Sequence, residues 1–271
     1  MKSKSELVRL TSRRLEAIVA DTGLQPASIV VAPLIPAEPP ISLAPELPLY
    51  PASMIKVPLV AAVLAILAEG SPPLSLETSI GVTPENMTAN DAESPLRPGY
   101  SATLRDLTRL AITRSDNVAT NVLFDVAGRQ RATAVARERF GLEATAFHRK
   151  LSGSEPLIED PLWDGVHRNT HPAGDAARLF DGIAGDRIAH AGLLREMLAE
   201  QEWNEKLTGG LREGDRFLHK TGDTDEVTHD GGILYTAEGR TYVVVAYTGL
   251  PSTPEHNERF APFMRAVREL L

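Results

Sequence analysis

A serine and a lysine lie three residues apart at the start of a long apolar segment. The stretch YPASMIKVPLVAAVL, residues 50–64, places Ser53 and Lys56 on one face of a predicted helix. A serine hydroxyl is a poor nucleophile at neutral pH unless a base lies within hydrogen-bond reach. A lysine can be that base where burial or a nearby cation destabilises its ammonium form. The pair therefore indicates a nucleophile with its base, although a surface helix can carry the same spacing by chance.

Two further triplets follow this pair along the chain. The segment RSDNVATN carries Ser115, Asp116 and Asn117 between two predicted helices. The segment HKTG carries a Lys-Thr-Gly triplet at residues 220–222 on a predicted strand. Each triplet alone is common, but the order SxxK, SDN, KTG in one chain is highly specific. A second lysine near the serine would also give a positive field that keeps one amine neutral and favours an anionic substrate.

The N-terminal part of the chain predicts one helix and one strand. An amphipathic helix, capped at Ser3 or Ser5 and ended by Gly23, precedes an apolar, β-branched strand at residues 27–34. The proline-rich segment 35–51 cannot be a central strand, so we expect an edge strand or a long loop there.

The rest of the chain changes period twice. Residues 53–203 repeat apolar side chains at intervals of three and four, which is typical of helices. The segments RFLHKTG, GGILYTAEGR and TYVVVAYTG then predict three strands, the last two joined by a tight turn at AEGR. An amphipathic helix at about residues 254–271 closes the chain.

These elements together predict an α+β fold. An antiparallel sheet of about five strands would be built from both chain ends and flanked by the terminal helices, with an inserted all-helical lobe. We expect one domain over residues 1–271, with a sheet lobe at about 1–52 and 205–271 and a helical lobe at about 53–204.

With these motifs in this order, the sequence resembles the class A β-lactamase-like serine hydrolases, in the superfamily of β-lactamases and penicillin-binding proteins. The similarity covers most of residues 50–250. The segments that carry it are YPASMIKVPLVAAVL, TLRDLTRLAITRSDNVATNVLFDVAG, NTHPAGDAARLF and HKTG followed by THDGGILY.

The resemblance implies a role for each motif residue. Ser53 would be the acylated nucleophile, Lys56 its base and proton relay, and Ser115 the group that passes a proton to the leaving nitrogen. The substrate would be held by Asn117 at its amide and by Lys220 and Thr221 at its carboxylate, with Gly222 completing the triplet and the backbone N–H groups of Ser53 and Asp223 forming the oxyanion hole. Asp116 is expected to fix the loop.

Class A β-lactamases also use a glutamate that activates the water for deacylation, and here the position of that residue is open. Counting on from the segment TAFHRKL at residues 145–151 places Leu151 there. Counting back from Thr170–Pro172 places Glu155 there, followed by a proline, and Glu159 is a third candidate. We predict Glu155 as the base. Without such a base the acyl-enzyme would persist.

Composition excludes several other functions. The chain has a net charge of −8 and a pI of about 5.4, which argues against a nucleic-acid partner. It has no cysteine, and its seven histidines lack the close spacing of a metal site, so we expect no metal and no cofactor. No segment resembles a secretory signal or reaches membrane-spanning length. We expect a soluble monomer that acts on a small molecule, cytoplasmic as the sequence stands, and periplasmic or secreted if a leader has been removed.

The leading hypothesis is a serine enzyme that opens β-lactam amides. One alternative is an esterase or penicillin-binding, peptidase-like hydrolase of the same fold, which the missing leader favours. Another is a non-catalytic ligand-binding module, against which the intact motif residues argue. The pair His229–Asp230 is expected in a surface turn rather than in substrate binding, and Trp203 is expected to serve packing.

Overall fold

The computed structural model describes residues 4–34, 39–70 and 73–271. The cap predicted at Ser3 lies outside this range, as does part of the proline-rich segment. The helices and strands are α1 (Lys4–Asp21), β1 (Ala27–Pro33), β2 (Ile41–Leu43), α2 (Lys56–Ala68), β3 (Ser79–Gly81), β4 (Ser101–Thr103), α3 (Leu104–Thr113), α4 (Asn117–Ala127), α5 (Arg129–Phe140), α6 (Ala173–Ala184), α7 (Ala191–Ala199), β5 (Arg216–Asp223), β6 (Thr228–Tyr235), β7 (Thr241–Thr248), α8 (Pro254–Glu258) and α9 (Phe260–Leu270).

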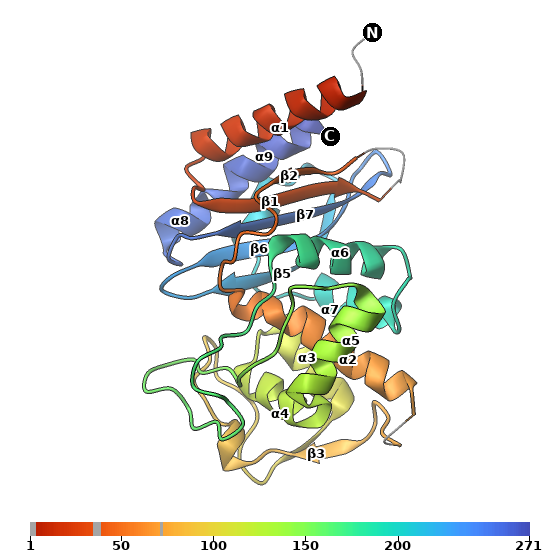
Figure 1. Ribbon diagram of the computed structural model, residues 1–271, viewed down its shortest axis with the longest axis vertical. Coiled ribbons are helices and arrows are strands. Elements are labelled where there is room, and N and C mark those ends of the chain that lie inside the picture. The colour runs from red at the N-terminus through yellow and green to blue at the C-terminus, as the bar shows by residue number, and fades with distance from the viewer. Residues whose placement is uncertain (1–3, 35–38, 71–72) are drawn as a thin grey trace.

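The main sheet has the strand order β2-β1-β7-β6-β5, and all its pairs are antiparallel. Strand β1, from the start of the chain, pairs with β7, from its end, over the register Ala27↔Thr248 to Pro33↔Tyr242. The predicted α+β fold with a sheet from both chain ends is therefore confirmed. The proline-rich segment supplies β2 at one edge, and β5 lies at the other edge, beside the helical lobe (Figure 1).

The two faces of the sheet are covered by different helices (Figure 1). Ile29 and Val31 of β1 join an apolar cluster with residues of α1 and α9. Val30, between them, joins the larger core that includes α2 and α6. Side chains alternate across a strand, so burial on both faces explains why these strands read as continuous apolar runs.

Helix α2 runs through the centre of the helical lobe. Every residue from Lys56 to Leu67 is buried, as expected of a helix that is apolar on all sides. Pro58 is the third residue of the helix, where the backbone N–H has no partner within the helix, so the proline is tolerated. The lobe also contains the short β3–β4 pair, an addition to the helices that the sequence predicted.

The C-terminal helix differs from its prediction because it is divided into α8 and α9, with Arg259 between them. Pro262 gives the physical reason. It has no N–H to donate to the carbonyl of Glu258, so one continuous helix would lose that hydrogen bond. In α9 the proline instead occupies the first turn, where the loss costs little.

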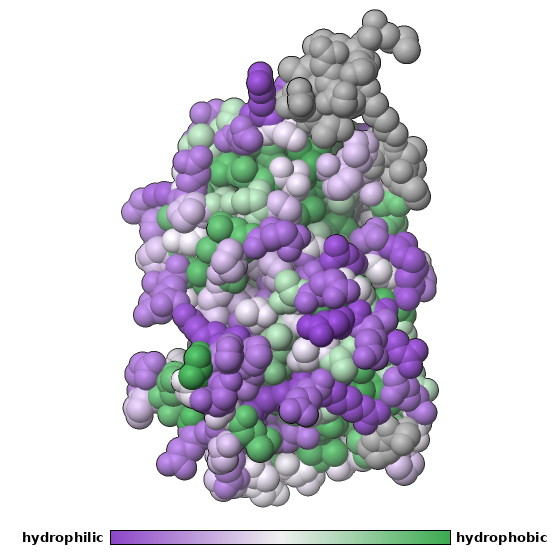
Figure 2. Space-filling model, in the orientation of Figure 1, coloured by the Kyte–Doolittle hydropathy of each residue, from purple (hydrophilic) through white to green (hydrophobic). Residues whose placement is uncertain are grey.

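Hydrophilic and hydrophobic residues are interspersed over the face shown in Figure 2. The large hydrophobic side chains that are exposed include Leu157, Leu162 and Val166, which all lie on the loop between α5 and α6. In the described part of the chain, no helix is long and apolar enough to cross a membrane.

Candidate active site

Ser53 lies in a 3₁₀ turn, Ala52–Ile55, that leads directly into α2. Ala52, the residue before it, has a left-handed backbone with φ of 48°. This conformation is uncommon for a residue with a side chain and is often found at functional sites. Ser53 is partly buried and lines two neighbouring cavities. The sequence predicted Ser53 on the helix itself, whereas the structure places it one turn earlier.

Strand β5 packs closely against the turn that carries Ser53, and Gly222 makes this possible. A Cβ atom at Gly222 would lie 3.0 Å from the carbonyl oxygen of Pro51 and 3.2 Å from the backbone nitrogen of Met54. Such contacts would push the strand away from the turn. The glycine of the KTG triplet therefore sets the distance between the two segments that carry the lysines.

His229 fixes the same turn from the neighbouring strand. Its Nε2 lies 2.8 Å from the carbonyl oxygen of Tyr50, and its Nδ1 accepts a hydrogen bond of 3.1 Å from the backbone N–H of Thr248. Because the carbonyl can only accept, Nε2 carries the proton. Burial lowers the pKa of His229 to about 4, so the imidazole is neutral at pH 7.

The expectation that the His229–Asp230 pair forms a surface turn is thus wrong, because both residues are fully buried in β6. Asp230 bonds His219 of β5 at 2.8 Å. The sequence prediction failed because the segment TDEVTHDGG is polar, and the turn ends before His229 instead of including it.

The hydroxyl of Ser115 lies between the two motif lysines. Lys56 Nζ and Lys220 Nζ are each 3.0 Å from Ser115 Oγ. Lys56 Nζ also contacts the carbonyl oxygen of Ser115 and lies 2.8 Å from Asn117 Oδ1. Lys220 Nζ contacts the carbonyl oxygen of Thr221 at 2.9 Å. The three motifs, distant in sequence, therefore meet around one hydroxyl.

These contacts define a consistent set of donors and acceptors. The carbonyl oxygen of Ser115 and Oδ1 of Asn117 can only accept, so they take two N–H bonds from Lys56. The third partner, Ser115 Oγ, can donate its proton to the lone pair of a neutral Lys56 amine while it accepts from the Lys220 ammonium. The geometry thus accommodates Lys56 as a base.

The electrostatics favour this neutral form. Burial, and then the positive charge of Lys220, hold the pKa of Lys56 well below its ordinary value. Burial lowers the pKa of Lys220 to about 7, although the carboxylate of Asp223 acts in the opposite direction. Both lysines are fully buried. Such shifts are typical of functional sites.

Burial of Lys220 should also cost stability, in a way that depends on pH. Between pH 7 and the ordinary lysine pKa, Lys220 binds more protons in the unfolded chain than in the folded chain. The free energy of unfolding that Lys220 contributes therefore falls as the pH is lowered towards 7. We expect Lys220→Met to raise the Tm at pH 7 by about 3 °C, which corresponds to about 1 kcal/mol for a chain of this size. Thermal unfolding at pH 7 and pH 10 tests this. An equal gain at both pH values would contradict it.

Asp116 and Ser115 shape the loop between α3 and α4. The Asp116 carboxylate caps α4 by accepting a hydrogen bond of 2.8 Å from the backbone N–H of Ala119, as its expected structural role requires. Ser115 has a left-handed backbone with φ of 57°. The cap and the strained residue together direct the Ser115 hydroxyl towards the lysines.

The loop residues considered for the deacylation base lie in different environments. Leu151 is buried, and its backbone N–H and carbonyl both bond the side chain of Asn121, at 2.8 and 3.0 Å. Glu155 is exposed. Together with Ser53 and Leu151 it lines a cavity of about 400 Å³, which we call the loop cavity. Among the described residues, no hydrogen bond or ion pair holds the Glu155 carboxylate. Glu159 is exposed and is not among the described residues that line this cavity.

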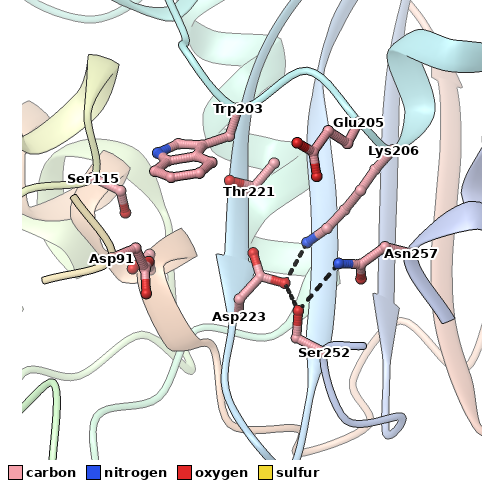
Figure 3. Close-up of a pocket in the computed structure, with 10 residues that line it drawn as sticks. Asp91, Ser115, Trp203, Glu205, Lys206, Thr221, Asp223, Ser252 and Asn257 are labelled. Carbon is pink, nitrogen blue, oxygen red and sulfur yellow. Dashed lines mark hydrogen bonds and ion pairs between the residues drawn. The ribbon is translucent and has the colours of Figure 1, made fainter. Parts of the chain in front are cut away.

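Ser53 also lines a second cavity, of about 350 Å³, which we call the Trp203 cavity (Figure 3). Sequence reasoning assigned Trp203 to packing and did not select the other residues that complete its wall. These are Asp91, Glu205, Lys206, Ser252 and Asn257. Four of them come from loops without a motif and Asn257 comes from α8, so only their tertiary position places them at the site. In the described chain, no group of three or more potential ligand side chains could hold a metal ion.

A buried hydroxyl between two lysines, beside a serine at the start of a helix, defines a site of the serine-hydrolase class. Comparison with known proteins identifies the family. The model of the beta-lactamase enzyme family matches residues 10–268, so the chain belongs to that family.

Individual relatives agree with this assignment. Beta-lactamase L2 of Stenotrophomonas maltophilia is 30% identical over 185 residues, which are 66% of this chain and 59% of that protein. The match thus spans less than two thirds of that relative's length. Among solved structures, PBP-A has a TM-score of 0.80 at 25% identity over 95% of each chain. An ancestral class A β-lactamase (GNCA) has a TM-score of 0.80 at 25% identity over 96% of this chain and 99% of that one.

Proposed function

We propose that the protein is a serine hydrolase that opens the amide of β-lactams through an acyl-enzyme on Ser53. The observation that carries this proposal is the Ser115 hydroxyl, held at 3.0 Å from both Lys56 and Lys220. This arrangement puts an amine that can take a proton and a hydroxyl that can give one to the leaving group in one cluster, and Ser53 lines the same cavity as Ser115. The names of the relatives support the same reaction class.

In the proposed acylation, Ser53 Oγ bonds to the carbonyl carbon of the lactam and its proton passes to the neutral Lys56 amine. The carbonyl oxygen becomes an oxyanion, which the backbone N–H groups of Ser53 and Asp223 would stabilise. The C–N bond then breaks, and Ser115 gives its proton to the leaving nitrogen. The Lys56 ammonium returns a proton to Ser115, which restores the cluster.

The remaining motif residues would hold the substrate. Asn117 is fixed by its bonds to Lys56 and, through Nδ2 at 2.8 Å, to the carbonyl oxygen of Ala89, so its side chain is preorganised for an amide beside Ser53. Lys220 and Thr221 would bind the polar group on the other side of the scissile bond. One chain supplies all these residues, so we propose that it acts as a monomer on a small molecule.

For the second half-reaction we propose Glu155 as the base that activates water, because it lines the loop cavity with Ser53. A second candidate function is a penicillin-binding type of hydrolase, in which the acyl-enzyme persists. Two features favour this alternative. Leu151 is buried and its backbone is fixed by Asn121. The Glu155 carboxylate has no hydrogen bond or ion pair among the described residues that would position it for catalysis.

The intact mass of the protein over time after mixing with benzylpenicillin tests the proposal. We expect an adduct of the mass of the whole β-lactam, because ring opening loses no atoms. Peptide mapping should locate the adduct on Ser53. A transient adduct indicates a β-lactamase and a lasting one the penicillin-binding type. A label on another residue, or no adduct together with no consumption of benzylpenicillin, would refute the proposal.

A further inference from the structure

Asp223, the residue that follows the KTG triplet, places a carboxylate in the wall of the site. Its Oδ1 accepts hydrogen bonds from Lys206 Nζ at 2.6 Å, Ser252 Oγ at 2.6 Å and Thr228 Oγ1 at 3.0 Å. Figure 3 shows the other carboxylate oxygen pointing away from Lys206 and Ser252. The side chain remains 32% exposed and lines both cavities beside Ser53. The carboxylate is therefore anchored, yet it faces the space that a substrate would fill.

The same contacts restrain the nearest cation. The Lys206 side chain is only 4% exposed, and its ammonium bonds Asp223 Oδ1 and, at 3.0 Å, the carbonyl oxygen of His229. An ammonium held by a carboxylate at this distance has much of its charge neutralised locally. Burial alone would raise the pKa of Asp223. The Lys206 ammonium and the hydrogen bonds to the carboxylate outweigh burial and hold this pKa below its ordinary value. The carboxylate thus stays ionised, and Lys206 is not free to meet a substrate anion.

Further carboxylates surround the pair. Of the described residues that line the Trp203 cavity, Asp91, Glu205 and Asp223 are acidic and Lys206 is the cation. The loop cavity is lined by Asp91, Glu155, Asp223 and Asp225, and by no lysine or arginine among the described residues. The loop cavity is thus lined by one sign of charge, and such a cleft lowers the local concentration of like-charged ligands. Thr221 lines the Trp203 cavity, where Lys206, the cation among its described lining residues, is paired with Asp223.

We propose that Asp223 makes the site select a substrate whose group beside Thr221 is an uncharged or cationic N–H donor, such as an amide or amine, against one with a free carboxylate. The inference rests on the proposed acyl transfer at Ser53 and specifies its substrate class. It departs from the anionic substrate, with a carboxylate bound by Lys220 and Thr221, that the sequence and the family resemblance predicted. Like-charge juxtaposition suppresses the wrong ligand, while a donor can bond the free oxygen of Asp223. Lys220 and Thr221 remain available to bind the carbonyl oxygen of the same group.

Benzylpenicillin and its carboxamide form a matched pair of probes, since they differ in the group that would lie beside Thr221. The second-order acylation rate constant of each is measured by intact mass for the wild type and for Asp223→Asn. The acid-to-amide ratio is the rate constant for benzylpenicillin divided by that for its carboxamide. Within one protein this ratio is independent of overall activity. Comparing the ratio between proteins cancels the difference in intrinsic reactivity between the two probes. We expect Asp223→Asn to raise this ratio by about tenfold or more, because the substitution removes the negative charge and leaves Lys206 unpaired.

Glu213→Gln is the control, because it changes the net charge equally at an exposed position outside both cavities. Its ratio should stay within about twofold of the wild type, since charges beyond a Debye length are screened. A rise equal to that of Asp223→Asn would overturn the inference. So would an unchanged ratio in Asp223→Asn when both probes acylate Ser53, and in that case the proposed acyl transfer would stand. Failure of both probes to acylate Ser53 would overturn the proposed function, and this inference with it.

The wild type provides a test that does not depend on the folding of a variant. Salt screens repulsion between a substrate carboxylate and the acidic wall, so the acid-to-amide ratio should rise between about 0.05 M and about 0.5 M NaCl. A ratio that falls with salt would mean that the site attracts the carboxylate, and it would overturn the inference.

Discussion

Lys56→Arg should lower the rate of Ser53 acylation by at least about a hundredfold, the lower range for a positioned general base. A guanidinium keeps the positive charge but stays protonated, so it cannot offer the lone pair that burial and Lys220 make accessible in Lys56. The planar group also cannot reproduce the contacts of one Nζ atom with Ser115 and Asn117. Stopped-flow or intact-mass kinetics with benzylpenicillin measure the loss.

Lys150→Arg is the matched control. Lys150 is also buried and ion-paired, with Asp125 at 2.8 Å, but it is not among the described residues that line either cavity. We expect its acylation rate to stay within about threefold of the wild type. Thermal unfolding should show that both variants are folded. Near-wild-type acylation by a folded Lys56→Arg would mean that another group accepts the proton of Ser53.

The sequence predicted the centre of the site well because each motif belongs to a local structure. Ser53 and Lys56 are joined by one turn, and Ser115 and Asn117 by one helix cap. The triplet that contains Lys220 lies on a strand that carries the apolar residues Phe217 and Leu218 near its start. That these segments meet follows from the resemblance to a known family, and the distances around Ser115 agree with it.

The wall of the site could not be predicted in the same way. Lys206 and Asp223 are 17 residues apart and belong to no common periodic element, so only the packing of a loop against β5 pairs them. The position of His229 depended on where a polar turn ends, which composition does not define. Trp203 was assigned to packing because an isolated aromatic residue carries no spacing signal.

The same reasoning applies to the fold. Strands β1 and β7 were predictable because burial of both sheet faces gives each a continuous apolar run. The short β3–β4 pair was missed because three-residue strands show too little alternation. The division of the last helix followed from Pro262, whose effect on the preceding turn was overlooked in an otherwise amphipathic pattern.

Glu155→Gln should leave acylation of Ser53 intact and slow deacylation, so that steady-state turnover of benzylpenicillin falls by two to four orders of magnitude, roughly the range for loss of a general base. The amide keeps the volume of the side chain in the loop cavity but cannot accept the proton of the attacking water. The acyl-enzyme should therefore accumulate. Intact mass during turnover and after removal of free β-lactam measures its lifetime.

Two companion variants determine which loop residue acts. Glu159→Gln removes a nearby exposed carboxylate of the same loop and should change the lifetime by less than about threefold, which separates loss of the base from general disturbance of the loop. Leu151→Glu places a carboxylate where the backbone is pinned by Asn121. If Glu155 is the base, this variant should not deacylate faster than the wild type. If instead Leu151→Glu shortens the lifetime and Glu155→Gln leaves it unchanged, Leu151 occupies the position of the base, and the wild-type protein retains its acyl group as a penicillin-binding type of hydrolase.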